Sequence, residues 1–339
     1  MTAEQDTPGQ TAADNNNAMD AKVDEEESKC PVDPFSHAIR LTPLQWLRTA
    51  LFAVFVFPVR LVLLLSVTTL SWALSALALR GLDADTIANK PLASLEGWRF
   101  FLQKASNALG LTACYISGFW ISVRGRMAST DEAPILVVAP HSTFYDGMAS
   151  FVSGGTYMVS RLENKAIPLL GKNIECAQAL FVSREDPLSR QKTVAEIIRR
   201  SASSDPWPHL LIFPEGSTSN RQALMTFKPG AFYPGKPVQP VVMRYGNKTD
   251  TVTWTWNQSH GALMVLFLTL SQPWTNAELE YLPVYYPSAA EIADPKLYAG
   301  NVRTVMASAL GVPVSDMTFE EVKSLYGKKK RKRTKSKNE

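Results

Sequence analysis

The chain has 339 residues, of which 45% are hydrophobic, so it holds enough apolar material for a sizeable buried core. Its net charge of +4 is unevenly spread, because residues 1–30 carry eight acids and two bases whereas residues 328–339 carry eight bases and one acid. This composition excludes a wholly disordered protein and leaves the middle of the chain close to neutral.

The N-terminal third is predicted to contain a polar head followed by apolar helices. Residues 1–33 are acidic and nearly free of large apolar groups, which predicts a disordered head. Nineteen uncharged residues, 61–79, match a bilayer core of roughly 30 Å at about 1.5 Å per helical residue. We therefore expect residues 42–82 to be a membrane anchor, either one helix or a helical hairpin, with a core helix of a soluble protein as the alternative. Residues 97–125 are expected to form an amphipathic helical segment in the membrane interface.

The pattern changes after Arg126 to short apolar runs separated by helical stretches. A basic helix is expected over residues 189–200 and a second helix over residues 297–310, ended by Gly311. VTWTW, residues 252–256, alternates at period two and predicts a strand. Strands that alternate with helices favour the α/β fold class, with a mostly parallel or mixed sheet flanked by helices. The apolar runs are ILVVA (135–139), ALFV (179–182), LLIF (210–213) and VVM (241–243).

The first candidate for chemistry follows the apolar run ILVVA directly. It reads Pro-His-Ser-Thr-Phe-Tyr-Asp, with His141 five residues before Asp146. On one helix the two side chains would point about 140° apart, so a turn between strand and helix has to bring them together. A carboxylate that fixes the tautomer of a histidine ring leaves the other ring nitrogen as a base near neutral pH. A histidine that merely caps a strand end is the alternative interpretation.

The second candidate follows the apolar run LLIF and reads Pro-Glu-Gly-Ser-Thr-Ser-Asn-Arg. Gly216 allows backbone N–H groups to approach an anion closely. Glu215 has an oxygen that accepts a hydrogen bond from a substrate hydroxyl, and Arg221 or Lys228 has the charge to pair with phosphate. A surface turn with a capping serine is the alternative here.

The sequence contains few residues in the patterns that bind metal ions. Its cysteines, Cys30, Cys114 and Cys176, are odd in number and form no C-x-x-C pair, which argues against a disulfide framework and a structural zinc site. There are four histidines and no H-E-x-x-H sequence. We therefore expect no metal site.

The order of these blocks resembles the glycerophospholipid acyltransferase family. Its four blocks are a His-x4-Asp block, an Arg-bearing block matched by residues 181–184, a Pro-Glu-Gly block and a Pro-rich strand matched by residues 237–240. Within that family the chain looks closest to the lysophosphatidylcholine acyltransferases, because of the sequences FKPGAF (227–232), PVQPVVMRY (237–245) and TVTWTW (251–256).

The resemblance implies an activity for residues 126–325, the expected acyltransferase domain. It implies transfer of an acyl group from acyl-CoA, a co-substrate, to the free hydroxyl of a lysophospholipid, above all lysophosphatidylcholine. No cofactor is implied. Acyl transfer to lysophosphatidic acid or glycerol-3-phosphate is the alternative within the enzyme class, and a non-catalytic lipid-binding membrane adaptor is the alternative outside it.

The resemblance also implies a role for each candidate residue. His141 takes the proton from the acceptor hydroxyl, and Asp146 orients His141. Binding of the acceptor or its phosphate is assigned to Arg184, Glu215, Gly216, Arg221 and Lys228. Where relatives in this branch read Glu-Gly-Thr-Cys, this chain reads Glu-Gly-Ser-Thr, which leaves acceptor and donor open. No EF-hand calcium loop is found, so the chain resembles a short form and calcium control is not expected.

The basic tail, residues 328–339, has several interpretations, of which a nuclear signal is disfavoured by the apolar segment at residues 61–79. It is a solvated tail, a binder of anionic lipid, or part of a dilysine-type signal for return to the endoplasmic reticulum, which indicates the endoplasmic reticulum membrane and also lipid droplets as locations. A nucleic-acid partner is not expected, because that reading depends on the tail alone.

Overall fold

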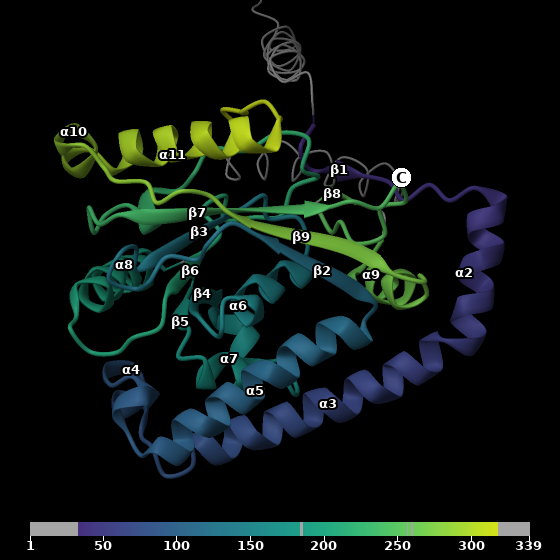
Figure 1. The fold of residues 1–339 in the computed structure, drawn as a ribbon, viewed down its shortest axis with the longest axis horizontal. Coiled ribbons are helices and arrows are strands. Elements are labelled where there is room, and N and C mark those ends of the chain that lie inside the picture. The colour runs from purple at the N-terminus through teal and green to yellow at the C-terminus, as the bar shows by residue number, and fades with distance from the viewer. Residues whose placement is uncertain (1–32, 184–185, 256, 259, 318–339) are drawn as a thin grey trace, which may run out of the picture.

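The computed structural model describes residues 33–183, 186–255, 257–258 and 260–317. The predicted basic tail, Arg184 and all but the last residue of the predicted acidic head lie outside these ranges. The described chain forms a central sheet with helices on both faces and a long pair of helices along one side (Figure 1).

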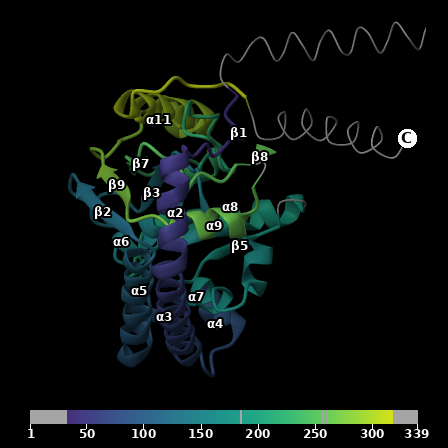
Figure 2. The same cartoon turned by 90° about the vertical axis from the view of Figure 1, so that its right-hand side faces the viewer.

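The first of the N-terminal helices has a well-capped start. α2 (Pro43–Phe55) has a proline in its first turn, and the side chains of Thr42 and Gln45 form a reciprocal capping box at its start. α3 (Phe57–Ala78) follows almost directly and has 22 residues. After the short α4 (Ala84–Asn89), α5 (Gly97–Ile116) runs back alongside α3 (Figures 1 and 2). α3 and α5 thus form a helical pair, the α3–α5 hairpin. It is not the hairpin considered for residues 42–82, since within that range α3 directly follows α2.

The contact between α3 and α5 is polar at its centre. The Ser106 hydroxyl lies 2.8 Å from the hydroxyls of both Ser71 and Ser75. Arg99 donates from α5 to the carbonyl oxygens of Ala78 and Arg80, at 2.8 and 2.9 Å. Because the last carbonyls of a helix lack partners within the helix, this arginine completes the end of α3.

The central sheet has seven strands in the order β2-β9-β7-β3-β6-β4-β5. Neighbouring strands are parallel except for β7 and β9, which are antiparallel. The prediction of an α/β fold with a mostly parallel or mixed sheet is therefore confirmed. The strands are β2 (Phe119–Arg124), β3 (Ile135–Ala139), β4 (Tyr157–Arg161), β5 (Leu180–Val182), β6 (Leu210–Ile212), β7 (Val238–Tyr245) and β9 (Thr275–Tyr281).

Strand β3 lies at the centre of the core, and all five of its residues are fully buried. Its alternate side chains enter two apolar clusters, one on each face of the sheet. One cluster includes Tyr298 and Val302 of α11, and the other includes Met148 of α6. The covering helices are α6 (Met148–Val152), α7 (Gly171–Cys176), α8 (Pro187–Ala202), α9 (Ala262–Leu270), α10 (Ala289–Ala293) and α11 (Pro295–Leu310).

Two segments differ from the sequence prediction. Residues 119–124, expected within a helical segment, form β2, because α5 ends at Ile116 and Gly118 turns the chain with φ +91° into a strand paired with β9. Residues 252–255, expected in a strand, form none. Their backbone N–H groups bind partners outside a sheet. Those of residues 252 and 253 donate to the Asp250 side chain, and that of Trp254 donates to the carbonyl of Ser142.

A short parallel ladder joins the N-terminal end of the described chain to residues 257–258. β1 (Ser36–His37) pairs with β8 (Asn257–Gln258), which directly follows the irregular segment. The helix predicted over residues 297–310 is confirmed as α11, which ends before Gly311.

Candidate active site

The first candidate block forms a tight turn at the carboxyl end of β3. After Pro140 the chain turns into a short 3-10 helix (Phe144–Gly147), whose first residues are capped by the Thr143 side chain. This turn brings Nδ1 of His141 within 2.9 Å of Oδ2 of Asp146. The turn required by the five-residue spacing is therefore present.

Asp146 is fully buried and its carboxylate is held from several sides. Oδ2 accepts the backbone N–H groups of Ser142 at 2.5 Å and Thr143 at 2.9 Å in addition to the bond with His141. Oδ1 accepts the Tyr245 hydroxyl at 2.7 Å. A buried carboxylate is costly unless such donors satisfy it, so this network fixes the position of Asp146.

His141 presents one ring nitrogen away from Asp146. Its side chain is 24% exposed, and its ring stacks on Phe213 with centroids 4.3 Å apart. When Nδ1 carries the proton that is donated to Asp146, Nε2 of the neutral ring has a free lone pair. The arrangement can therefore accept a proton from a bound hydroxyl.

Glu215 lies in the loop after β6 and is only 1% exposed. Burial raises its pKa well above the ordinary value; the Ser219 hydroxyl and the backbone of His141 partly offset this, and the charge of Asp146 adds to it. Neither carboxylate oxygen makes a hydrogen bond of normal geometry. Burial therefore favours the protonated form of Glu215, which lies beside the backbone of His141.

Gly216 and Lys228, two of the predicted binding residues, lie together. Gly216 has φ +68°, and a Cβ atom on it would lie 2.9 Å from the Lys228 Cε. The Lys228 backbone N–H donates to the carbonyl of Pro214 at 2.8 Å. The absence of a side chain at Gly216 is thus what lets the Lys228 chain cross the loop.

Arg221 joins the two candidate blocks. Its Nη1 donates to the Ser142 hydroxyl at 3.1 Å and its Nη2 donates to the Asp250 carboxylate. Its guanidinium also lies 5.1 Å from the centroid of the Tyr245 ring. Arg221 therefore has a polar, an ionic and an aromatic partner from within the protein.

The residue before Arg221 anchors an N-terminal strap, which we define as residues 33–37. The Asn220 backbone N–H donates to Pro34 at 2.7 Å, and its side-chain amide donates to the carbonyls of Asp33 at 2.7 Å and Ser36 at 3.0 Å. Phe35 in the strap is fully buried against Met225. The loop after β6 is thus tied to the segment that leads into α2.

Sequence reasoning missed Phe213, Asn220, Tyr245 and Asp250 as members of the site. Tyr245 ends β7, which only the folded sheet shows to be the parallel neighbour of β3. Since the carboxyl ends of parallel strands meet at one edge, a polar residue there lies close to His141. The other three have no distinctive spacing in the sequence.

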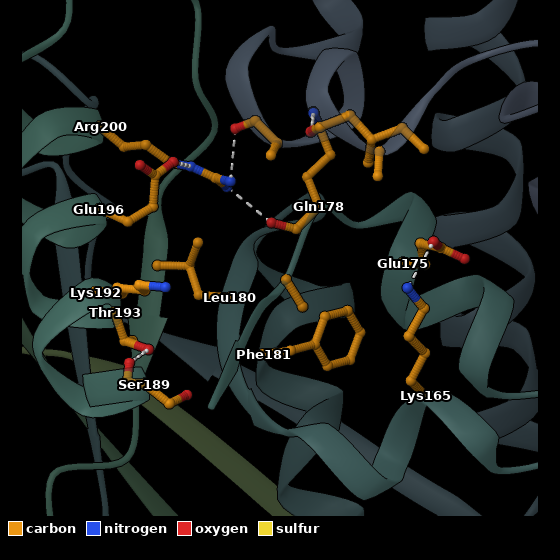
Figure 3. A pocket seen from close by; sticks show the side chains of 14 residues that line it. Lys165, Glu175, Gln178, Leu180, Phe181, Ser189, Lys192, Thr193, Glu196 and Arg200 are labelled. Carbon is orange, nitrogen blue, oxygen red and sulfur yellow. Dashed lines mark hydrogen bonds and ion pairs between the residues drawn. The ribbon is translucent and has the colours of Figure 1, made fainter. Parts of the chain in front are cut away.

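A separate pocket of about 310 Å³ lies at edge strand β5 of the sheet, between that strand, α4, α7 and α8 (Figure 3). Arg200 at its wall is 4% exposed and donates to Glu196 and to the carbonyl of Gln178. Lys165 and Lys192 also line it, but His141, Asp146 and Glu215 do not. The pocket is therefore distinct from the candidate active site.

Among the described residues, no group of three or more histidine, cysteine, aspartate or glutamate side chains is arranged to hold a metal ion. The described cysteines, Cys114 and Cys176, are free thiols whose pKa values burial raises to about 12 and about 11. Neither is poised as a thiolate at neutral pH.

Residues 121–244 match the family model described as Acyltransferase, and this range contains the His141 turn and the Glu215 loop. This segment of the chain is thus similar to the acyltransferase family. Its similar curated proteins include lysophosphatidylcholine acyltransferases. The one from Drosophila melanogaster is 46% identical over 294 residues, 86% of this chain and 54% of that protein, and human lysophosphatidylcholine acyltransferase 1 is 46% identical over 290 residues, 85% of this chain and 53% of that protein.

The chain thus spans about half the length of these relatives. Among solved structures, the 1-acyl-sn-glycerophosphate acyltransferase of Thermotoga maritima aligns with a TM-score of 0.46 and 14% identity, covering 80% of this chain and 99% of that one.

Proposed function

We propose that this protein transfers an acyl group from acyl-CoA to the free hydroxyl of a lysophospholipid, with lysophosphatidylcholine as the preferred acceptor. The observation that carries the proposal is the contact between His141 and the buried Asp146 at the end of a central strand. The similarity to lysophosphatidylcholine acyltransferases supports the choice of acceptor.

In the proposed reaction, Nε2 of His141 accepts the proton of the acceptor hydroxyl while the hydroxyl oxygen attacks the thioester carbonyl. The tetrahedral intermediate then collapses, the carbon–sulfur bond breaks, and the CoA sulfur takes the proton from the imidazolium. Ser142 and Thr143 adjoin the base, yet both are fully buried, which supports direct transfer without an acyl-enzyme.

The acceptor is proposed to bind at the loop after β6. The exposed Lys228 side chain lies beside Gly216 there, which has no side chain to block the approach of a substrate. Arg221 would bind a phosphate in place of its present partner Asp250. Glu215, when protonated, is a hydrogen-bond donor beside the catalytic turn. The role predicted for Arg184 stays a prediction, because that residue lies outside the described ranges.

The protein is proposed to act at a membrane. Within the described residues, α3 is the one helix long and apolar enough to cross a bilayer, and only 17% of its most apolar window is buried in the protein. Both proposed substrates are amphiphiles that gather at membranes, so such an anchor would place the site beside them. The endoplasmic reticulum membrane is the proposed location, with lipid droplets as a second one.

Acyl transfer by membranes that contain the protein tests this proposal. Labelled acyl-CoA is supplied with a panel of lysophospholipids to the wild type and to His141→Ala, and a fall of at least about 100-fold is expected for the variant, since general bases contribute on that order or more. His209→Asn is a matched control. His209 precedes β6 at the opposite edge of the sheet, so its loss leaves the chemistry intact.

The panel also decides between the alternatives. Product that depends on His141 and favours a choline acceptor supports the proposal, while a preference for lysophosphatidic acid moves the protein to that neighbouring activity. Full activity of a folded His141→Ala protein rules out the proposed base. Absence of product with every acceptor favours the membrane adaptor.

A further inference from the structure

Tyr245 is placed differently from the other donors to Asp146. Those donors, His141 and the backbone N–H groups of Ser142 and Thr143, lie within five residues of Asp146 and all bind Oδ2. Tyr245 lies 99 residues away in the sequence and binds Oδ1 at 2.7 Å. Its hydrogen bond therefore ties the catalytic turn to a different strand of the sheet.

The Tyr245 ring is itself held on two sides. The guanidinium of Arg221 lies 5.1 Å from its centroid on one side, and the ring of Phe119 in β2 packs edge-on with centroids 6.3 Å apart. Burial and the neighbouring charge of Asp146 raise the pKa of Tyr245 well above its ordinary value. The phenol thus keeps its proton and acts as a fixed donor.

We propose that Tyr245 is a positioning residue of this enzyme, acting through Asp146 to hold His141 in its productive orientation and tautomer. This inference rests on the proposed function, in which His141 is the base. Tyr245 does not touch the reacting atoms in this scheme. Arg221 contributes to the same arrangement. It packs against the Tyr245 ring and donates to the Ser142 hydroxyl in the His141 turn.

The proposal sets the direction of a pH effect. A carboxylate that loses one donor becomes more basic and stabilises the imidazolium of His141 more strongly. Since the base works in its neutral form, the acid limb of the activity profile should move to higher pH in a variant without the phenol hydroxyl. The other titratable groups around the turn, Glu215, Arg221 and Asp250, are unchanged in that variant.

The experiment compares Tyr245→Phe with Tyr281→Phe, both as full chains in membranes. Tyr281, in the neighbouring strand β9, is a matched control. Its hydroxyl is hydrogen-bonded to Ser153 at 2.8 Å and not to Asp146. For Tyr245→Phe we expect kcat to fall about tenfold, as for loss of one hydrogen bond to a charged group, with the KM of both substrates unchanged within about twofold. The acid limb should move up, whereas Tyr281→Phe should keep the wild-type profile.

Three results would overturn the inference: wild-type kcat and pH profile in Tyr245→Phe, a rise in KM alone, or equal losses in both variants with no movement of the acid limb. Each would assign Tyr245 to packing or to substrate binding. His141→Ala, assayed alongside, separates this from failure of the proposed function. Full activity of His141→Ala would show that His141 is not the base. If His141→Ala is inactive while Tyr245→Phe behaves as the wild type, only the positioning role is wrong.

Discussion

The α3–α5 hairpin and the central sheet bury opposite kinds of residue. In β3 every buried residue is apolar, as expected of a core formed in water. In α3 the buried residues are two serines and an alanine, whereas large apolar side chains such as Leu63 and Leu70 are about half exposed, at 47% and 51%. The hairpin is polar at its inner contact and apolar outside. The two regions of one chain are thus adapted to different surroundings.

The largest expected effect comes from charging the outer face of the hairpin. Leu63→Arg combined with Leu70→Arg should release the protein from membranes, since each arginine near the centre of a membrane helix costs about 3 kcal/mol. Sedimentation with lipid vesicles measures the bound fraction. The matched control is Leu188→Arg with Ile198→Arg, two exposed positions on α8 that should leave binding unchanged. Wild-type binding by the α3 variant would contradict an apolar environment for this face.

A smaller effect is expected inside the hairpin. Ser106→Val removes the hydroxyl that lies between the buried hydroxyls of Ser71 and Ser75, and loss of both hydroxyl contacts should lower the free energy of unfolding by about 2 kcal/mol. Thermal unfolding in detergent measures it. Thr112→Val, on the same helix, removes an exposed hydroxyl bonded to the carbonyl of Ala108, and it should change stability by less than about 0.5 kcal/mol. Equal shifts would show that the serine contact contributes nothing specific.

A third expected effect concerns the dependence of stability on pH in the sheet domain. Because the pKa of Glu215 is raised in the folded state, the folded protein binds this proton more tightly than the unfolded chain does. Stability is then greatest below the ordinary glutamate pKa and falls as pH rises toward the raised value, by at most about 1.4 kcal/mol per pH unit for one proton. Glu215→Gln should flatten this fall, as measured by unfolding midpoints from pH 5 to 8. The exposed Glu163→Gln should not, and an unchanged slope in Glu215→Gln would mean that Glu215 is charged in the folded protein.

Much of the sheet could be predicted because its central strands are buried on both faces. Such strands read as continuous apolar runs, and the runs at residues 135–139 and 210–213 correspond to β3 and β6. Strands nearer the edge carry mixed sequences. β2 reads FWISVR and β9 reads TNAELEY, and their partners are each other across more than 150 residues, so neither has a local signal of its own.

In the candidate site, the pairing of His141 with Asp146 could be expected because both residues lie in one short block. The predicted roles of the binding residues have not been tested by the structure, although it does bring Gly216 and Lys228 together. Tyr245 and Asp250 could not be assigned in the same way. Their contacts with the turn and with Arg221 depend on the order of strands in the folded sheet, which no spacing in the sequence encodes.

The N-terminal strap sets a limit for any shortened form of this protein. Asn220 binds the backbone carbonyls on both sides of Phe35, so an alternative start site or an affinity tag placed before residue 33 leaves all of these bonds in place. A start at α2 would remove them together with the buried phenylalanine. Such a form would keep every residue proposed for catalysis. It would still lack the N-terminal strap, to which Asn220 ties the loop after β6.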